Sequence, residues 1–261
     1  MLNVDFKRLF VIPFFYIFIG ICFVVPILIL VMTTMMDGTV SVNPQTGLPS
    51  EPMQGFDYVW QILGSVSSSG ANASDPSAGM SMSMDLTTMC NINMLFFGIS
   101  VLTCVFISDD FKSGYVKNLF TVRPLKSDYV ISKNLVCCFG SACAFIAFFI
   151  GAVIGGAISD LPFSTDGITA LNVVFCMLSK ICLIPLFIGI FSLMGVIAKQ
   201  KTWLSICLSL GVGMLLFMTI PLLTPLNASI VHVVGCLIGS VVFAFGLGCI
   251  SNAVLKKTSL I

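Results

Sequence analysis

Few side chains in this sequence belong to the types that catalyse reactions, and they do not converge. The chain has one histidine, His232, and one glutamate, Glu51. The histidine stands near the start of the last apolar stretch, and the glutamate stands in a polar segment rich in turn-forming residues. A membrane-embedded protease or acyltransferase needs His, Glu, Ser or Asp side chains that meet within the apolar segments. The sequence therefore argues against an enzyme, and we expect no catalytic residue.

The eleven cysteines do not show the spacing of a metal site or of a disulfide framework. All but Cys90 fall within long apolar stretches, no C-x-x-C occurs, and a single histidine cannot complete a zinc site. The segment MSMSMDLTTM, residues 80–89, offers methionine thioethers that could bind Cu(I). We favour the plainer interpretation, an apolar-leaning loop, and we expect no metal in this chain.

Lys180 is the only basic residue inside an apolar stretch that is long enough to cross a membrane, residues 170–198. An ammonium left at the centre of a bilayer costs about 3 kcal/mol on insertion scales. Two interpretations stay open. In one, Lys180 faces a cavity and is a candidate for the substrate path; in the other, its flexible side chain reaches toward the nearer membrane surface.

The elements that must position these side chains are membrane-spanning helices. Of the 261 residues, 57% are hydrophobic and only 9% are charged, which is too little charge to cover a water-soluble domain of this size. A hydrocarbon layer needs about 20 apolar residues per helix. We therefore predict an all-α integral membrane protein, a single transmembrane domain over 1–261, with six spans near 9–36, 91–107, 135–158, 170–198, 203–223 and 230–254.

The placement of charge predicts which side of the membrane each connection lies on. With six spans, eleven of the twelve basic residues fall in the segments that would share one side with both termini, and the alternate segments contain none. Basic residues are enriched in cytoplasmic loops. We therefore expect cytoplasmic N- and C-termini, an extracellular loop at 37–90 and a cytoplasmic segment at 108–134.

Glycines spaced four residues apart occur in two of the predicted spans, as Gly151 with Gly155 and as Gly235 with Gly239. Such pairs expose a strip of backbone that a neighbouring helix can approach closely. We expect packing within the subunit, with a contact between two copies of the chain as the alternative.

The cytoplasmic segment SDDFKSGYVKNLFTVRPLKSDYVISKN contains a short two-faced helix. Apolar and aromatic side chains recur on one face, while lysine, asparagine and threonine lie on the others. The Arg123–Pro124 step should end this helix, because a residue before proline disfavours the helical region. Ser127, followed by Asp128, should cap a new helix that continues into the third span.

This segment resembles the first cytoplasmic loop of ABC-2-type permeases, the membrane subunits of one class of ATP-binding-cassette transporters. Asp109 and Asp110 stand where that family has acidic residues, Gly114 matches its glycine, Lys126 falls where arginine is usual, and Lys133 matches its terminal lysine. The chain departs from the family pattern at two positions. Tyr115 follows the glycine where a small hydroxyl residue is common, and Pro124 comes one position later than the family's proline. The resemblance covers about 27 residues.

The resemblance implies a six-helix, type V exporter-like fold whose cytoplasmic loop is a coupling helix that docks into a groove of a separate ATP-binding subunit. By the same resemblance, docking would involve Asp109, Asp110, Phe111, Gly114, Tyr115, Lys117, Leu119, Phe120, Lys126 and Lys133. In the plainer alternative, the charges among them only anchor the loop at the lipid headgroups. The chain itself has no G-x-x-x-x-G-K-[ST] motif, so ATP and Mg²⁺ would bind to the partner.

These expectations together describe the permease subunit of an exporter, or of a peptide-immunity transporter, in a bacterial plasma membrane. The subunit would pair with a second copy or a related permease, would be surrounded by lipid and would not bind nucleic acid. The apparent lack of carboxylates within the spans argues against proton or sodium coupling and favours an apolar or amphiphilic substrate. The alternative is a self-contained channel or secondary carrier that needs no ATPase.

Overall fold

The structure, a computed structural model, describes residues 2–34, 62–63, 91–122, 126–159, 170–199, 201–217, 219–225 and 228–257. The predicted extracellular loop at 37–90, with its methionines and Cys90, lies outside the described residues except for 62–63. Throughout the described ranges every regular element is a helix, which confirms the predicted all-α class. The elements are α1 (Leu2–Val11), α2 (Pro13–Thr34), the 3₁₀ helix η1 (Ile92–Met94), α5 (Leu95–Lys112), α6 (Tyr115–Val122), α7 (Lys126–Ile158), α8 (Ala170–Ala198), α9 (Thr202–Phe217), α10 (Thr219–Leu223) and α11 (Ile230–Lys257).

Five of the described helices, α2, α5, α7, α8 and α11, are long and apolar enough to cross a membrane. The predicted span at 203–223 instead consists of the apolar 16-residue helix α9 followed by the five-residue helix α10. The described part of the chain is thus compatible with a multi-pass membrane protein.

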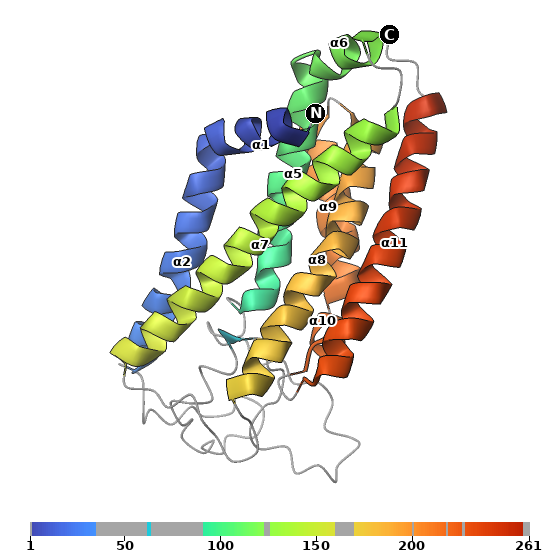
Figure 1. Ribbon diagram of the computed structural model, residues 1–261. Coiled ribbons are helices and arrows are strands. Elements are labelled where there is room, and N and C mark those ends of the chain that lie inside the picture. The colour runs from blue at the N-terminus through green and yellow to red at the C-terminus, as the bar shows by residue number, and fades with distance from the viewer. Residues whose placement is uncertain are drawn as a thin grey trace, which may run out of the picture.

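The predicted first span, 9–36, begins too early. The helix breaks at Ile12, and Pro13 starts α2, a position where proline's fixed φ and missing N–H cost nothing. The preceding ten residues form a separate helix, α1, which runs across the end of the bundle in Figure 1. This helix has two faces: Asp5 and Leu9 are buried, whereas Val4 and Val11 are exposed.

The long helices pack side by side as a bundle, with α2 along α7 and α8 along α11, while α5 contacts α8 and α9 (Figure 1). The elements that the charge pattern assigned to the cytoplasmic side, namely α1, α6 and the last turn of α11, all lie at one end of this bundle. That end is called the α6 end below.

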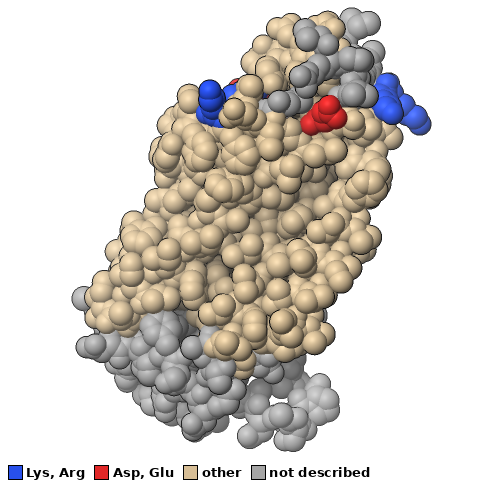
Figure 2. Space-filling view, viewed as in Figure 1, with Lys and Arg blue, Asp and Glu red and all other residues tan. Residues whose placement is uncertain are grey.

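The surface between the two ends of the bundle is apolar. In Figure 2, the coloured lysine, arginine, aspartate and glutamate side chains lie at the α6 end, and an uncharged belt covers the length of the helices below it. Large apolar side chains on α2 and α11 are exposed, among them Ile17 at 59%, Val242 at 64% and Phe245 at 75%. Side chains of this kind are stable at a protein surface when lipid surrounds them.

The two glycine pairs behave differently. A Cβ at Gly151 would collide with the backbone carbonyl of Phe23, and one at Gly155 would lie 2.9 Å from the Cα of Ile27, so α7 approaches the backbone of α2 closely there. Gly235 and Gly239, by contrast, have nothing within 4 Å among the described residues. The predicted packing within the subunit is therefore right for the first pair and wrong for the second, which lies on the open face of α11.

This difference predicts opposite effects for two identical substitutions. Gly151→Ala should destabilise the purified protein by about 1–3 kcal/mol, because an overpacked α2–α7 contact must move apart. Gly235→Ala should be neutral or slightly stabilising, because its methyl group meets no neighbour and alanine favours the helix. Thermal unfolding in detergent measures both, and equal midpoints for the two variants would contradict the close α2–α7 contact.

Candidate functional site

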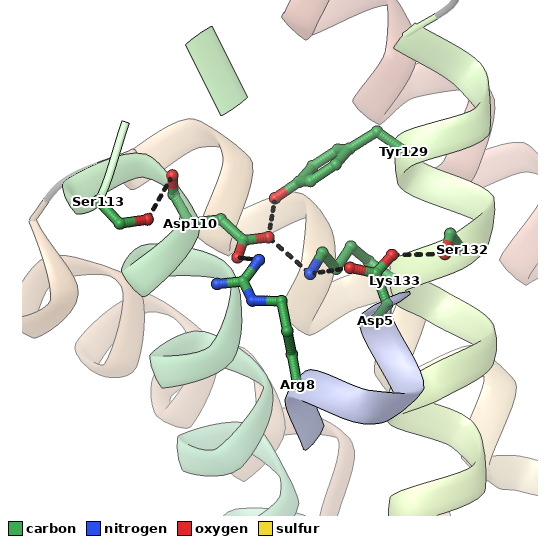
Figure 3. Close-up of polar contacts among 7 residues, drawn as sticks. All are labelled: Asp5, Arg8, Asp110, Ser113, Tyr129, Ser132 and Lys133. Atoms are coloured by element: carbon green, nitrogen blue, oxygen red, sulfur yellow. Dashed lines mark hydrogen bonds and ion pairs between the residues drawn. The ribbon is translucent and has the colours of Figure 1, made fainter. Parts of the chain in front are cut away.

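Four charged side chains meet at the α6 end of the bundle (Figure 3). The Lys133 ammonium of α7 lies 2.7 Å from Asp5 Oδ1 of α1 and 2.7 Å from Asp110 Oδ2 of α5. The Arg8 guanidinium of α1 lies 2.5 Å from Asp110 Oδ1. Two carboxylates and two cations therefore form one neutral network, called the charge network below, which joins three helices.

Three members of the charge network are buried, whereas the Arg8 side chain is 26% exposed, and hydroxyl groups supply part of the remaining hydrogen bonds of the carboxylates. Asp5 and Asp110 are 0% exposed and Lys133 is 1% exposed. The Tyr129 hydroxyl donates to Asp110 Oδ2 at 3.0 Å, and the Ser132 hydroxyl donates to Asp5 Oδ2 at 2.5 Å. Each carboxylate thus receives both an ion pair and a hydroxyl bond, which offsets part of the cost of removing it from water.

Aromatic rings enclose the cations. Lys133 Nζ lies 4.0 Å from the centroid of the Phe106 ring, and the Arg8 guanidinium lies 4.4 Å from that of Tyr115. Burial and the charge of Asp5 raise the pKa of the Tyr115 phenol, and the neighbouring Arg8 opposes this rise. Tyr115 therefore stays protonated at neutral pH, and its ring gives α6 a direct contact with the network.

Helical spacing explains how the local sequence presents these groups. Asp5 and Arg8 are three residues apart, and Tyr129 and Lys133 are four apart, so each pair lies on one face of its helix. Asp110 lies in the last turn of α5, which continues five residues beyond the predicted end of that span at 107. The described part of α5 therefore carries a buried carboxylate in the turn that follows the predicted span.

A tight turn and an apolar patch place α6 beside the network. Gly114 has φ +72°, a conformation that suits glycine, and it separates α5 from α6. The apolar face of α6 packs on the bundle, where the Phe120 and Tyr129 ring centroids are 5.9 Å apart. This patch, the seat of α6, consists of buried Ile107, Phe111, Val116, Tyr129, Val130, Val196 and Leu255, with partly buried Leu119, Phe120 and Val254 against it.

The structure thus sorts the predicted docking residues into two groups. Asp110 and Lys133 lie inside the charge network, Phe111 is buried in the seat of α6, and Tyr115, Leu119 and Phe120 are half-buried at its margin. The exposed residues are Asp109 and Lys117, to which the structure adds Lys112 and Asn118. Lys126 is the first residue of α7, and its side chain lies outside the described residues.

The ends of α6 agree closely with the sequence pattern. α6 ends at Val122, directly before the Arg123–Pro124 step, whose residues lie outside the described ranges. The next helix, α7, begins at Lys126, one residue before the predicted cap at Ser127. The Ser127 hydroxyl instead lies 3.5 Å from Asp128 Oδ1.

Two members of the charge network, Asp5 and Arg8, and its two hydroxyl donors, Tyr129 and Ser132, are not among the residues that the sequence singles out. The spacing of Asp5 and Arg8 places opposite charges on one helical face with Leu9, which is buried. That pairing was the available signal. It indicates a helix that turns a polar face inward, but it does not indicate which helix it meets.

Lys180, the substrate-path candidate, lies far from the α6 end and is also fully buried. Its ammonium donates to Asn93 Oδ1 at 2.8 Å and to Thr224 Oγ1 at 2.9 Å. Lys180 is 0% exposed, so its ammonium ends among protein groups, and both interpretations of its place in the membrane stay predictions.

The described residues contain no group of three or more His, Cys, Asp or Glu side chains placed to hold a metal ion. The charge network has no spare carboxylate oxygen for a cation, because all four of its oxygens face Lys133, Arg8, Tyr129 or Ser132.

Comparisons with protein-family models, curated proteins and solved structures found no match.

The network predicts unequal effects for two adjacent aspartates. Asp110→Asn should destabilise the protein by about 3–5 kcal/mol, because it leaves the buried Lys133 ammonium and the partly exposed Arg8 guanidinium with one carboxylate between them. Asp109→Asn, one residue away but exposed, should change stability by about 0.5 kcal/mol or less. Denaturant or thermal unfolding in detergent compares them.

A double substitution provides the control for this pair. Lys133→Met combined with Asp110→Asn should cost less than the sum of the single changes, because the two side chains share one ion pair. Additive costs, or equal effects at Asp109 and Asp110, would show that the network does not stabilise the fold.

Proposed function

We propose that this chain is the permease subunit of an ATP-driven transporter of the ABC-2 type, and that α6 is the helix through which a separate ATP-binding subunit acts on it. The observation that carries the proposal is the position of α6. It is a short helix at the end of the bundle with one face packed on its seat and the other face exposed. The resemblance of residues 108–134 to the cytoplasmic loop of that family supports the same assignment.

The connections of α6 suit a part that passes force into the membrane domain. Tyr115 contacts Arg8, Arg8 pairs with Asp110, and Lys133 joins Asp110 to Asp5. A displacement of α6 would therefore move α1, α5 and α7 together, because the ion pairs that join these helices resist separation. A loop that only anchored charges at the headgroups would not need these buried links.

The exposed face of α6 and its preceding turn is the surface that a partner would contact. Lys112, Lys117 and Asn118 are exposed there, while the aromatic residues are held by the seat. We therefore assign docking to this basic face and to the half-buried margin formed by Leu119 and Phe120. The complementary groove on the partner would carry acidic residues at its rim.

The proposed complex has six spans per permease chain, with α9 and α10 together forming the fifth, and two permease chains in a bacterial plasma membrane. ATP and Mg²⁺ would bind to the ATPase subunits. The open apolar surfaces of the long helices suit export of an apolar or amphiphilic compound, such as a lipid, a hydrophobic peptide or a drug-like molecule.

A second candidate, a self-contained proton-coupled carrier, rests on the buried carboxylates Asp5 and Asp110. Intramembrane carboxylates serve as proton relays in many carriers. Here, however, both carboxylates are already engaged by cations and hydroxyl groups. Transport by the purified chain alone, reconstituted into vesicles with a pH gradient, would favour this candidate.

The test of the main proposal is purification of the tagged chain from its own membranes in mild detergent. A subunit with a P-loop motif and measurable ATPase activity should co-purify with the unaltered chain. Lys112→Glu combined with Lys117→Glu should reduce the amount recovered at least about tenfold, because like charges at the rim cost several kcal/mol. Recovery of no ATPase with the unaltered chain would overturn the proposal.

A matched control uses the same charge reversal elsewhere at the same end of the bundle. Lys256→Glu combined with Lys257→Glu changes two exposed lysines in the last turn of α11 and should leave recovery of the ATPase unchanged. Leu119→Asp or Phe120→Asp should abolish stimulation of the ATPase while membrane insertion persists, because a carboxylate weakens both the seat and the docking margin. Full coupling in both Asp variants would show that the docking face is misassigned.

A further inference from the structure

Lys180 joins three separate segments at the end of the bundle opposite α6. It lies on α8, ten residues after the first residue, Ala170, which places it about 15 Å along the helix axis. Asn93 belongs to η1, just before α5 begins, and Thr224 directly follows α10. All three side chains are buried, with Lys180 and Asn93 both 0% exposed.

This cluster has more hydrogen-bond donors than it uses. The ammonium has three N–H groups, and the contacts among the described residues use two, to Asn93 Oδ1 and Thr224 Oγ1. The Asn93 amide nitrogen is buried and has no partner in the described part of the chain. One charged donor and one amide donor are therefore left without acceptors among the described residues.

No charged side chain among the described residues balances the charge of Lys180. Every ion pair among the described residues belongs to the charge network at the α6 end, so no described carboxylate pairs with Lys180. The hydroxyl and amide oxygens that it contacts are neutral. An ammonium buried without an opposite charge is expensive, and this contrasts with Lys133, which is buried between two carboxylates.

We propose that Lys180 and Asn93 form a binding site for one anionic group, a phosphate or a carboxylate. An oxygen of such a group would accept from the ammonium and from the Asn93 amide nitrogen, and its charge would balance that of the lysine. Thr224 is the partner of Lys180 that an anion would replace. Its hydroxyl also donates to the backbone carbonyl of Ile220 at 2.8 Å, so it keeps a partner when it leaves Lys180.

In the proposed transporter, this anion would be the headgroup of an amphiphilic substrate, and that identity rests on the proposed function. Binding itself does not, because it needs no ATPase. The site therefore narrows the substrate class to molecules that combine an apolar part with one negative group. A cationic amphiphile should be excluded, since Lys180 would repel it.

The experiment measures thermal unfolding of the purified chain in a neutral detergent with added dodecyl phosphate. The midpoint should rise by about 5 °C or more at a hundredfold excess over the dissociation constant. Dodecyltrimethylammonium, with the same chain length and the opposite charge, should give no rise. Inorganic phosphate alone separates the two sources of the anion: an equal rise identifies a free anion as sufficient, and a rise only with dodecyl phosphate identifies the amphiphile.

Variants tie the effect to the site. Lys180→Met and Asn93→Ala should lose most of the rise, whereas Thr224→Val and the exposed-site control Lys257→Met should keep it. If Lys180→Met does not fold, the contrast between Asn93→Ala and Thr224→Val decides. The proposal is overturned if the unaltered chain shows no rise, if the cationic amphiphile acts equally, or if Asn93→Ala keeps the full effect. A chain that binds dodecyl phosphate but recovers no ATPase would keep this site and lose the transporter assignment.

Discussion

The ion pairs of Lys133 with Asp5 and Asp110 are the interaction on which the α6 end of the molecule depends. One ammonium holds α1, α5 and α7 at a common point. Because all three groups are buried, none can exchange its partner for water without a large desolvation cost. The positions of α1 and α6 follow from this point, since α1 supplies Asp5 and Arg8 while α6 rests beside them through Tyr115.

The middle of the bundle is held by contacts of another kind. Between α2 and α7, Gly151 and Gly155 let the two backbones approach closely, and apolar side chains fill the remaining contacts. Lipid competes poorly with such close packing because it depends on shape. The helices are therefore held together by ion pairs at the α6 end and by close packing along their length.

The two buried lysines show how different surroundings give one residue type different uses. Lys133 has two carboxylates and an aromatic ring around it, so its charge is satisfied and its role is to hold helices together. Lys180 has only neutral oxygens within the described residues, so its charge remains available to a ligand. Sequence alone flagged Lys180 as unusual and treated Lys133 as a family match, and neither assignment revealed this contrast.

The sequence by itself determined the class of the protein, because long apolar runs have only one stable form in lipid, the helix. It also determined the two faces of α6 and the point where α6 ends, since both depend on neighbours in the chain. Only the tertiary structure decided that Asp110 pairs with Arg8 and Lys133, that Gly235 lies on an open face, and that Lys180 meets Asn93 and Thr224. Tertiary contacts in this protein join residues as many as 128 positions apart, as in the pair of Asp5 with Lys133. Helical periodicity shows which face of a helix is polar, but the partner of that face is chosen by how whole helices pack.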